Sequence, residues 1–276
     1  MDSLRPLLIT YAYNILGSLE EAKDIVQDAF ERFMHADTEH VLDKRSYLIR
    51  IVINLSINRK KRKQKIVADY PGEWLPEPVA TEKADRGIEQ RELLSYSLMV
   101  ILEKLNPRQR AVFILKEAFD YEHEQIAEVL EISPENSRKI FSRARSRLQI
   151  DSPVDERLVP KAYLDKYIHV ISKGDTERLE QLLADDIAIV SDGGGKVAAF
   201  RKPIVGRERV MKVLLGLNKK YYSRVNMKWG MVNHQSALFH YYEGQLITCQ
   251  IFSYNGHQLE RIYFMRNPDK LKALQN

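Results

Sequence analysis

Acid–base or phosphate chemistry in this 276-residue sequence would depend on side chains in its second half. Asp192 and Lys196 enclose three consecutive glycines, a composition that phosphate-binding loops share. Those loops continue with Ser or Thr and lead into a helix, whereas Lys196 is followed by the strand-like run Val-Ala-Ala-Phe. The motif therefore predicts a hairpin turn between two strands in preference to a nucleotide site.

A second set of titratable side chains could act as acids or bases: Asp165, His169, Asp192, His234 and His240. Polar side chains line pockets more often than they catalyse reactions, so we expect a pocket without turnover and no catalytic residue. Asp192 stands among turn residues, which suits docking better than general base catalysis. The single cysteine, Cys249, argues against an internal disulfide and a cysteine-rich zinc site, and we expect no metal and no cofactor.

The elements that must position these residues run from helices to strands. The later strand-like runs are separated by hairpin signals at Glu243-Gly244 and Asn255-Gly256. This order predicts an α+β domain with an antiparallel sheet. The expected helices are 159–172, 176–183 and 207–217, and the expected strands are 187–191, 197–200, 225–232, 237–242, 246–254 and 259–265.

Residues 121–148 carry the signals of a helix-turn-helix. Ser133 followed by Pro134 is typical of a helix start, after a first helix that ends near Leu130. Between Arg138 and Arg147 the second helix has five basic residues and no acidic one, which predicts DNA binding over a merely solvated face. The inward stripe of this helix is expected to contain Ser137, Ile140, Phe141, Ala144 and Leu148.

Another basic helix is expected to begin at Ser46. Six of the seven residues from Arg59 to Lys65 are basic. Cations are favourable at a helix C-terminus, but the helix dipole acts over about one turn and this run covers nearly two. With Asn54 and Asn58 on the same helix, the pattern predicts contact with DNA phosphates and one or two bases.

Two shorter helices precede it. The first is expected over 4–16, with Gly17 at its end, and Ser18 is expected to cap the second, which continues to residue 34. The second helix has a polar surface that includes Asp24, Gln27 and Asp28. A solvated face is the ordinary meaning of such a pattern, and periodicity alone supports nothing more specific.

Residues 68–90 read as an extended linker. They contain three prolines, and six acidic residues against two basic ones, which disfavours a helix. Trp74 and Leu75 do not fit a purely solvated segment, because such segments are poor in large apolar side chains. We therefore expect this part of the linker to dock on a folded surface.

Composition limits the class of protein. The chain is 44% apolar and 29% charged, with a net charge of +5 and a pI near 9.0, as expected of a globular protein with a modest basic excess. We find neither the pattern of a signal peptide nor an apolar run approaching the roughly 18 residues of a membrane span. The sequence is therefore expected to be cytoplasmic, without a membrane partner.

From Ala12 to Leu148 these segments resemble an extracytoplasmic-function sigma factor of bacterial RNA polymerase. The resemblance implies that core polymerase binds Asp24, Gln27, Asp28 and Phe30. It implies that the minus-ten promoter element binds Asn54, Asn58, Arg59 and Arg62, and the minus-thirty-five element binds Asn136, Ser137, Arg138, Lys139 and Arg143. Two positions depart from the family pattern: many members have Gly at Glu131, in a turn that prefers positive φ, and Asp at Asn58.

The C-terminal part resembles a SnoaL-like domain, a cone of curved sheet and helices, which a subgroup of these sigma factors carries as a fusion. Three motifs of that subgroup are present: Trp74-Leu75-Pro76-Glu77-Pro78, Asp192-Gly193-Gly194-Gly195-Lys196 and Asn267-Pro268-Asp269-Lys270-Leu271. The resemblance implies that this domain regulates the sigma factor in cis, so that no separate anti-sigma factor is required. We expect the linker to dock near the glycines and residues 269–274 to form a short helix that helps hold it.

The expected organisation is multidomain: two all-α DNA-binding domains followed by an α+β SnoaL-like domain. Its limits are 1–67 for sigma region two, 68–90 for the linker, 91–150 for sigma region four and 151–276 for the regulatory domain. The resemblance implies binding to core RNA polymerase and promoter DNA, and it leaves open a small-molecule ligand of the C-terminal domain. Two other interpretations are a SnoaL-like cyclase or hydrolase that carries a DNA-binding region, and a repressor or activator that does not bind polymerase.

Overall fold

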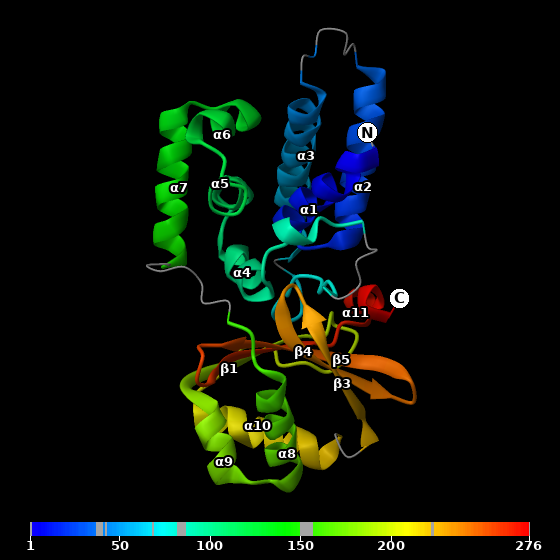
Figure 1. Ribbon diagram of the computed structural model, residues 1–276, viewed down its shortest axis with the longest axis vertical. Coiled ribbons are helices and arrows are strands. Elements are labelled where there is room, and N and C mark those ends of the chain that lie inside the picture. The colour runs from blue at the N-terminus through cyan, green and yellow to red at the C-terminus, as the bar shows by residue number, and fades with distance from the viewer. Residues whose placement is uncertain are drawn as a thin grey trace. The chain divides into compact units, whose positions relative to one another are not determined.

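The computed structural model describes residues 2–36, 41, 43–67, 69–81, 87–149, 157–221 and 224–275. The chain forms two compact units, a helical unit of residues 1–68 and 83–154 and a C-terminal unit of residues 69–82 and 155–276 (Figure 1). The first half of the predicted linker thus belongs to the C-terminal unit. The predicted limits at 67/68 and 150/151 adjoin residues that lie outside the described ones, so these limits stay predictions. Linker residues 82–86 also lie outside the described residues.

The helical unit begins as its capping signals predict. A short 3₁₀ turn, η1 (Asp2–Leu4), leads into α1 (Arg5–Leu16), which ends at Gly17 with a φ of 75°. The Ser18 hydroxyl accepts a hydrogen bond from the Glu21 amide and starts α2 (Leu19–His35). The apolar side of α2 is buried, so its polar side faces outward.

Helix α3 (Lys44–Val67) begins two residues before the predicted start at Ser46. The cap is Asp43, whose carboxylate accepts hydrogen bonds from the amides of Arg45 and Ser46 at 2.9 and 3.1 Å. The Ser46 hydroxyl donates to the same carboxylate at 2.5 Å, so this serine supports the cap instead of forming it. The hydrogen bond to Ser46 lowers the pKa of Asp43 below its usual value.

The second half of the helical unit contains the helix-turn-helix. Its elements are η2 (Gln90–Glu92), α4 (Tyr96–Ile101), η3 (Leu102–Lys104), α5 (Pro107–Glu117), α6 (His123–Leu130) and α7 (Pro134–Leu148). Asn106 and Gln109 form a capping box at the start of α5, and the Ser133 hydroxyl caps α7 as predicted. Helices α5 and α6 both pack against α3 within this unit.

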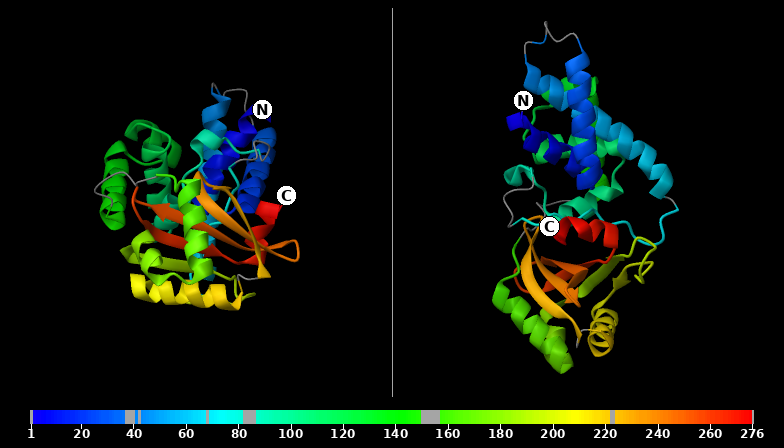
Figure 2. Two further views of the ribbon diagram at one scale, coloured as in Figure 1. Left: turned by 60° about the horizontal axis from the view of Figure 1, so that its bottom comes forward. Right: turned by 90° about the vertical axis from the view of Figure 1, so that its right-hand side faces the viewer.

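The C-terminal unit is a six-stranded sheet with helices on both faces. The strand order is β2-β1-β6-β5-β4-β3. Helices α8 (Lys161–Lys173), α9 (Thr176–Leu182) and α10 (Arg207–Lys220) cover one face, and α11 (Pro268–Gln275) lies on the opposite face (Figure 2). The strands are β1 (Leu183–Asp192), β2 (Ile204–Val205), β3 (Asn226–Val232), β4 (Gln235–Tyr242), β5 (Gln245–Tyr254) and β6 (Leu259–Met265).

Two predictions about the sheet are wrong. The sheet is mixed, because β6 returns beside β1 and pairs with it in parallel. Residues 197–200 do not form a strand, so the glycine motif is not a hairpin turn: the Phe200 amide donates to the Ser191 hydroxyl at 2.7 Å and is not free for a ladder. The partner of β1 on that side is β2, which begins only at Ile204.

The remaining predicted elements of this unit are present. The turns at Glu243-Gly244 and Asn255-Gly256 join β4 to β5 and β5 to β6, and α11 forms where a short helix was expected. The core lies between the sheet and α8, α9 and α10, with Leu164, Leu179 and Leu214 fully buried. Of the helices in the described part of the chain, none combines the length and hydrophobicity needed to cross a membrane.

Candidate nucleic-acid interface and linker-binding site

The outer face of α7 presents most of the residues predicted to bind the minus-thirty-five element. Asn136, Lys139 and Arg143 are exposed. Arg138 is also exposed, and its guanidinium donates to the Glu124 carboxylate of α6 at 2.6 Å. Because a pair this exposed is weakly held, the guanidinium can exchange Glu124 for a DNA phosphate or base at little cost.

Ser137 does not lie on this face, and its prediction as a groove contact is wrong. The side chain is fully buried, as its other predicted place in the inward stripe requires. Its hydroxyl hydrogen-bonds with Nδ1 of His123 at 2.9 Å and so ties α7 to the start of α6. Burial lowers the pKa of His123, and the positive charges of Arg138 and Lys116 act in the same direction.

The turn of the helix-turn-helix keeps its shape despite the glutamate. Glu131 adopts left-handed φ and ψ angles of 54° and 52°, and the chain continues with the Ile132 amide donating to the Ala127 carbonyl at 3.0 Å. Gly reaches this conformation without the steric cost that a Cβ brings. Glu131 therefore carries strain that the glycine found in many sigma factors avoids.

On α3, the predicted minus-ten contacts Asn54, Asn58 and Arg62 recur every four residues and therefore share one face. Asn58 and Arg62 are exposed, and Arg59 beside them is half-buried. The Asn54 amide donates to the Val129 carbonyl of α6 at 3.0 Å. In this arrangement of the helical unit, α6 thus occupies a polar group that the resemblance assigns to promoter DNA.

Lys60 is not a phosphate contact, although it lies in the basic run. It is 4% exposed, and its ammonium donates to the Leu16 carbonyl at 3.1 Å and to the Glu103 carboxylate. Lys63, in the next turn, pairs with Glu21 of α2 at 2.9 Å. Two of the basic residues therefore hold α3 to its neighbours, and the cations left for DNA are fewer than the sequence predicts.

Helix α2 exposes three of the four predicted polymerase contacts. Asp24, Gln27 and Asp28 are exposed, whereas Phe30 is only 8% exposed, with the Arg5 guanidinium 4.9 Å from its ring centre. In this structure Phe30 is a packing residue and not a surface contact. Met34, which sequence reasoning missed, is 66% exposed two turns beyond Gln27 and adds an apolar side chain to the same face of α2.

The C-terminal unit contains a linker-binding site centred on the Asp192 carboxylate, which is fully buried at the end of β1. One oxygen accepts from the Tyr70 hydroxyl at 2.6 Å and from the Gly194 amide at 2.9 Å. The other accepts from the Leu75 amide at 3.0 Å and from the Lys270 ammonium at 2.6 Å. A single buried carboxylate thus joins two linker residues, the glycine turn and α11.

Lys270 completes the charge balance of this site. Its ammonium donates to the Leu75 carbonyl at 2.5 Å as well as to Asp192, and it lies 4.1 Å from the ring centre of Trp74. A cation over an indole face is attracted by the ring's quadrupole. Burial, together with hydrogen bonding to Asp192, raises the pKa of Tyr70, so its hydroxyl stays a donor.

The three glycines leave room for the chain segments around them. A Cβ on Gly194 would collide with the side chain of Asn267, and one on Gly195 would lie 2.7 Å from Pro71 of the linker. Both have positive φ, 64° and 70°. Pro71 of the linker and Asn267 before α11 approach these glycines so closely that larger residues would not fit. The linker therefore docks near this turn, as predicted.

The end of the linker segment pairs with the edge of the sheet. Val79 exchanges hydrogen bonds with Asn233, its amide donating to the Asn233 side chain and its carbonyl accepting from the Asn233 amide, both at 2.9 Å. The Thr81 amide donates to the Met231 carbonyl at 3.0 Å. Linker residues therefore cover backbone groups at the end of edge strand β3. Neither Tyr70 nor Asn233 carried a sequence signal for this role.

The five candidate acids and bases are not brought together. Asp165 and His169 are exposed on α8, Asp192 is committed to the linker, and His234 lies in the β3–β4 turn. His240 lines a cavity between the sheet and the helices, and burial lowers its pKa to about 4. Among the described residues that line this cavity there is no carboxylate.

Comparisons with known proteins agree with the two halves of the helical unit. Residues 1–66 match the model of Sigma-70 region 2, and residues 95–148 match that of Sigma-70 region 4. The chain is 30% identical over 227 residues to the ECF RNA polymerase sigma factor SigJ of Mycobacterium tuberculosis strain ATCC 25618 / H37Rv, covering 80% of this chain and 72% of that protein. It is 28% identical over 224 residues to the probable ECF RNA polymerase sigma factor SigI of Mycobacterium tuberculosis strain CDC 1551 / Oshkosh, covering 76% and 73%.

The fold is likewise shared with a solved structure. The crystal structure of the Mycobacterium tuberculosis extracytoplasmic function sigma factor SigJ superposes with a TM-score of 0.78, at 24% identity, over 99% of this chain and 97% of that one. The helices and the α+β domain thus have the fold of a sigma factor with a fused C-terminal domain. The chain belongs to the extracytoplasmic-function RNA polymerase sigma factors.

Proposed function

We propose that this sigma factor directs core RNA polymerase to a two-part promoter and that its C-terminal unit regulates it in cis through the linker. The observation that carries the proposal is the Asp192 site, because it holds linker residues 70–75 that follow the first sigma region along the chain. Release or retention of this segment changes how much free chain connects the two DNA-binding regions.

The DNA contacts in this proposal are Asn58, Arg59 and Arg62 for the minus-ten element, with Asn54 available once α6 moves away. Asn136, Arg138, Lys139 and Arg143 are the proposed contacts for the minus-thirty-five element. Adjacent base pairs are 3.4 Å apart, so two elements separated by about 25 base pairs lie roughly 80 Å apart along the duplex. Since α3 and α6 touch in this structure, the helical unit must open to bind both.

The proposed polymerase surface consists of Asp24, Gln27 and Asp28 on α2, together with Met34. Acidic and amide groups around one exposed apolar side chain fit an interface with an anchor and a polar rim. The proposed limits remain 1–67 for region two, 68–90 for the linker, 91–150 for region four and 151–276 for the regulatory domain. Action on polymerase places the protein in the cytoplasm, without a need for a separate anti-sigma factor.

Catalysis by the C-terminal unit is not part of the proposal. A proton transfer needs an acid or base whose pKa is near the working pH, and His240, with a pKa near 4, is a weak base in a cavity without a described carboxylate. A small-molecule ligand of this unit is compatible with regulation and with the absence of turnover. The cyclase or hydrolase alternative predicts conversion of a polycyclic ketide or an epoxide by the purified protein.

Run-off transcription with purified core polymerase tests the proposal. Transcription should depend on the added protein, and Trp74→Ala, Asp192→Asn and truncation before Asn267 should alter it in a correlated, non-additive way, because all three act on one site. Asp186→Asn is the matched control: its pair with Arg261 is exposed and lies outside the linker-binding site, so its loss should have little effect. Independent, additive effects of the three changes would contradict regulation through the linker.

A further inference from the structure

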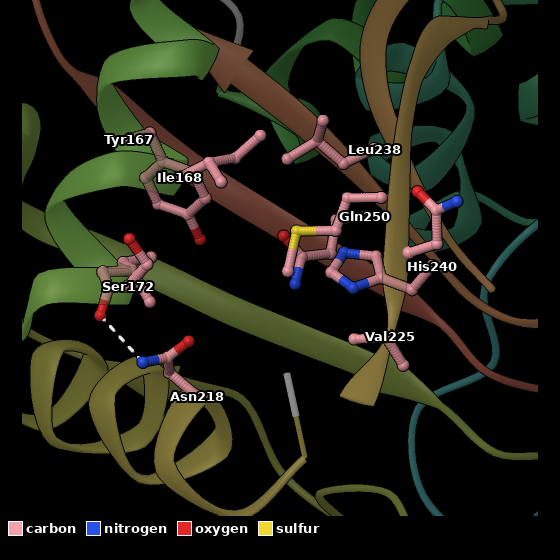
Figure 3. A pocket seen from close by; sticks show the side chains of 11 residues that line it. Tyr167, Ile168, Ser172, Asn218, Val225, Leu238, His240 and Gln250 are labelled. Atoms are coloured by element: carbon pink, nitrogen blue, oxygen red, sulfur yellow. Dashed lines mark hydrogen bonds between the residues drawn. The ribbon is translucent and has the colours of Figure 1, made fainter. Parts of the chain in front are cut away.

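The sheet and the helices α8 and α10 enclose a cavity of about 460 Å³, in the size range of small-molecule sites. Figure 3 shows Tyr167 and Ile168 on α8 across the cavity from Leu238, His240 and Gln250 on the strands. The Asn218 amide at its edge donates to the Ile171 carbonyl at 2.9 Å, which joins α10 to α8. The wall is thus built from both helices and the sheet.

The chemistry of the wall excludes a charged ligand. Among the described residues that line the cavity, none is acidic, lysine or arginine. Its histidine, His240, is 1% exposed; burial lowers the pKa to about 4, and hydrogen bonding to Gln250 only partly opposes this, so the ring is neutral near pH 7. An ion brought into such a wall would lose its hydration without gaining an opposite charge.

The polar groups of the wall lie among apolar ones. Tyr167, His240 and Gln250 supply a hydroxyl, an imidazole and an amide, all three less than 3% exposed. Ile171, Met227 and Leu238 supply apolar surface. A few polar groups that fix orientation within a mostly apolar wall are typical of sites for small organic molecules.

A second hollow of about 220 Å³ adjoins the first, since His240 and Val225 line both. Ser191, Phe200 and Arg266 are in its wall, where the Arg266 guanidinium donates to the Ala198 carbonyl and the Phe200 amide donates to the Ser191 hydroxyl. Successive strand residues point to opposite faces, so Ser191 faces this hollow while Asp192 faces the linker. A molecule in this hollow would therefore press on the segment that follows the glycine turn.

We propose that the first cavity binds a neutral, largely apolar small molecule carrying a hydrogen-bonding group, that this molecule extends into the second hollow beside Arg266, and that its binding changes the hold of Asp192 on the linker. The second half of this inference rests on the proposed regulation in cis, whereas the first half does not. Ligand and linker contact successive residues of β1, Ser191 and Asp192, on opposite faces of the sheet, and the ligand acts only by favouring one state of that segment.

The first experiment titrates the full chain with N-phenyl-1-naphthylamine, a neutral fluorescent probe with one N–H donor. Its charged counterpart, 8-anilino-1-naphthalenesulfonate, has the same rings plus a sulfonate. We expect one site for the neutral probe and at least tenfold weaker binding of the sulfonate, because the described residues of the first cavity's wall offer it no cation. Equal affinities for the two probes would overturn the assignment of a neutral ligand.

Two substitutions on α8 locate the binding site. Ile168→Phe enlarges a side chain that lines the cavity, whereas Ala162→Phe makes a comparable addition at an exposed position of the same helix. The neutral probe should bind Ile168→Phe about tenfold more weakly and Ala162→Phe unchanged. Because both chains keep the buried core residues, unchanged binding to Ile168→Phe, with circular dichroism like that of the parent, would overturn the site.

Hydrogen exchange tests transmission to the linker. The amides of Leu75, Val79 and Thr81 donate to Asp192, Asn233 and Met231, so their exchange reports release of the linker. Saturating neutral probe should change their exchange several-fold and leave α5 in the helical unit unaffected. If the neutral probe binds selectively but the exchange of these three amides stays the same, the proposed effect of the ligand on the linker is ruled out. If exchange changes while Asp192→Asn leaves transcription unaltered, the ligand site stands and the proposed regulation fails.

Discussion

The Lys60 ammonium donates to both carboxylate oxygens of Glu103, at 2.8 and 2.9 Å, and thereby joins α3 to η3 inside the helical unit. Arg110, fully buried, contacts the same carboxylate and donates to the Asn14 carbonyl of α1 at 2.9 Å. Burial raises the pKa of Glu103, but Arg110 and Lys60 outweigh it and hold that pKa below its usual value. One carboxylate thus compensates two buried cations.

Glu103→Gln should therefore destabilise the helical unit strongly. The amide keeps the shape of the side chain but leaves the buried Arg110 guanidinium, and Lys60 whenever it is protonated, without an opposite charge, and breaking a buried pair costs about 3–5 kcal/mol. Urea unfolding followed by far-UV circular dichroism measures the loss. Glu124→Gln is the matched control, because its pair with Arg138 is exposed to solvent and should contribute little to stability. Equal losses of unfolding free energy for the two variants would show that the buried pair contributes no more to stability than the exposed pair.

Lys60 should make the stability of the helical unit rise with pH. Burial and the charge of Arg110 lower its pKa from 10.5 in the unfolded chain to about 7. Between these values the unfolded chain binds a proton that the folded chain does not, so the free energy of unfolding increases as pH rises. Comparing urea midpoints of the parent and Lys60→Met at pH 7.5 and 9.5 isolates this contribution. If the stability of the parent did not rise relative to that of Lys60→Met between the two pH values, the prediction would be wrong.

Arg143→Ala and Ser137→Ala should separate DNA binding from folding on α7. Arg143 is exposed, and its loss should reduce use of the upstream promoter element by about 1–3 kcal/mol if it contacts a base in two places. Ser137 is buried against His123, so its loss should lower stability by about 1 kcal/mol and leave promoter preference unchanged. Competition binding with variant promoters and thermal unfolding measure the two effects. If Ser137→Ala altered promoter preference, the assignment of Ser137 to folding instead of DNA binding would be wrong.

Met34→Gln should weaken binding to core polymerase. An exposed apolar side chain at the proposed surface gains roughly 1–2 kcal/mol on burial, which corresponds to about a five- to thirtyfold loss of affinity. Val205→Gln is the control, since Val205 is 50% exposed on β2 of the other unit and should bind core as the parent does. Competition for labelled core polymerase measures both. Similar affinities for the two variants would remove Met34 from the interface.

Glu131→Gly should stabilise the helix-turn-helix. Its left-handed conformation costs a residue with a Cβ about 1 kcal/mol, which Gly avoids. Glu128→Gly, one turn earlier at an exposed position inside α6, should cost about 1 kcal/mol because Gly is a poor helix former. Thermal unfolding should therefore shift in opposite directions for two substitutions of the same kind. A shift in the same direction would mean that the turn is not strained.

Local signals predicted the elements better than their assembly. Gly17, Ser18 and Ser133 mark helix ends because capping depends on neighbours in sequence, and the hairpins around Gly244 and Gly256 follow from turn geometry alone. The parallel pairing of β1 with β6 depends on how the chain returns across the sheet, which local periodicity does not encode. For the same reason the sequence predicted antiparallel pairing throughout.

The pattern of charged residues likewise did not show which basic side chains are buried and which are exposed. Lys60 and Arg62 look alike in sequence, yet Lys60 is buried beside Glu103 and Arg62 is exposed. The partner that decides between them is 43 residues away. Docking of Trp74 and Leu75 was predictable because apolar residues in a polar linker need a surface, whereas the roles of Tyr70 and Asn233 depend on contacts 122 and 154 residues away.

The position of Lys270 sets the order of events during synthesis. It is made 195 residues after Leu75, the linker residue whose carbonyl it binds. At about 5–20 residues per second, a ribosome needs roughly 10–40 s to cover that distance. During the part of this interval that follows residue 150, both sigma regions and the linker have been translated without the lysine that secures the linker to Asp192. Each nascent chain therefore passes through a stage in which its promoter-binding regions are complete and its own restraint is not.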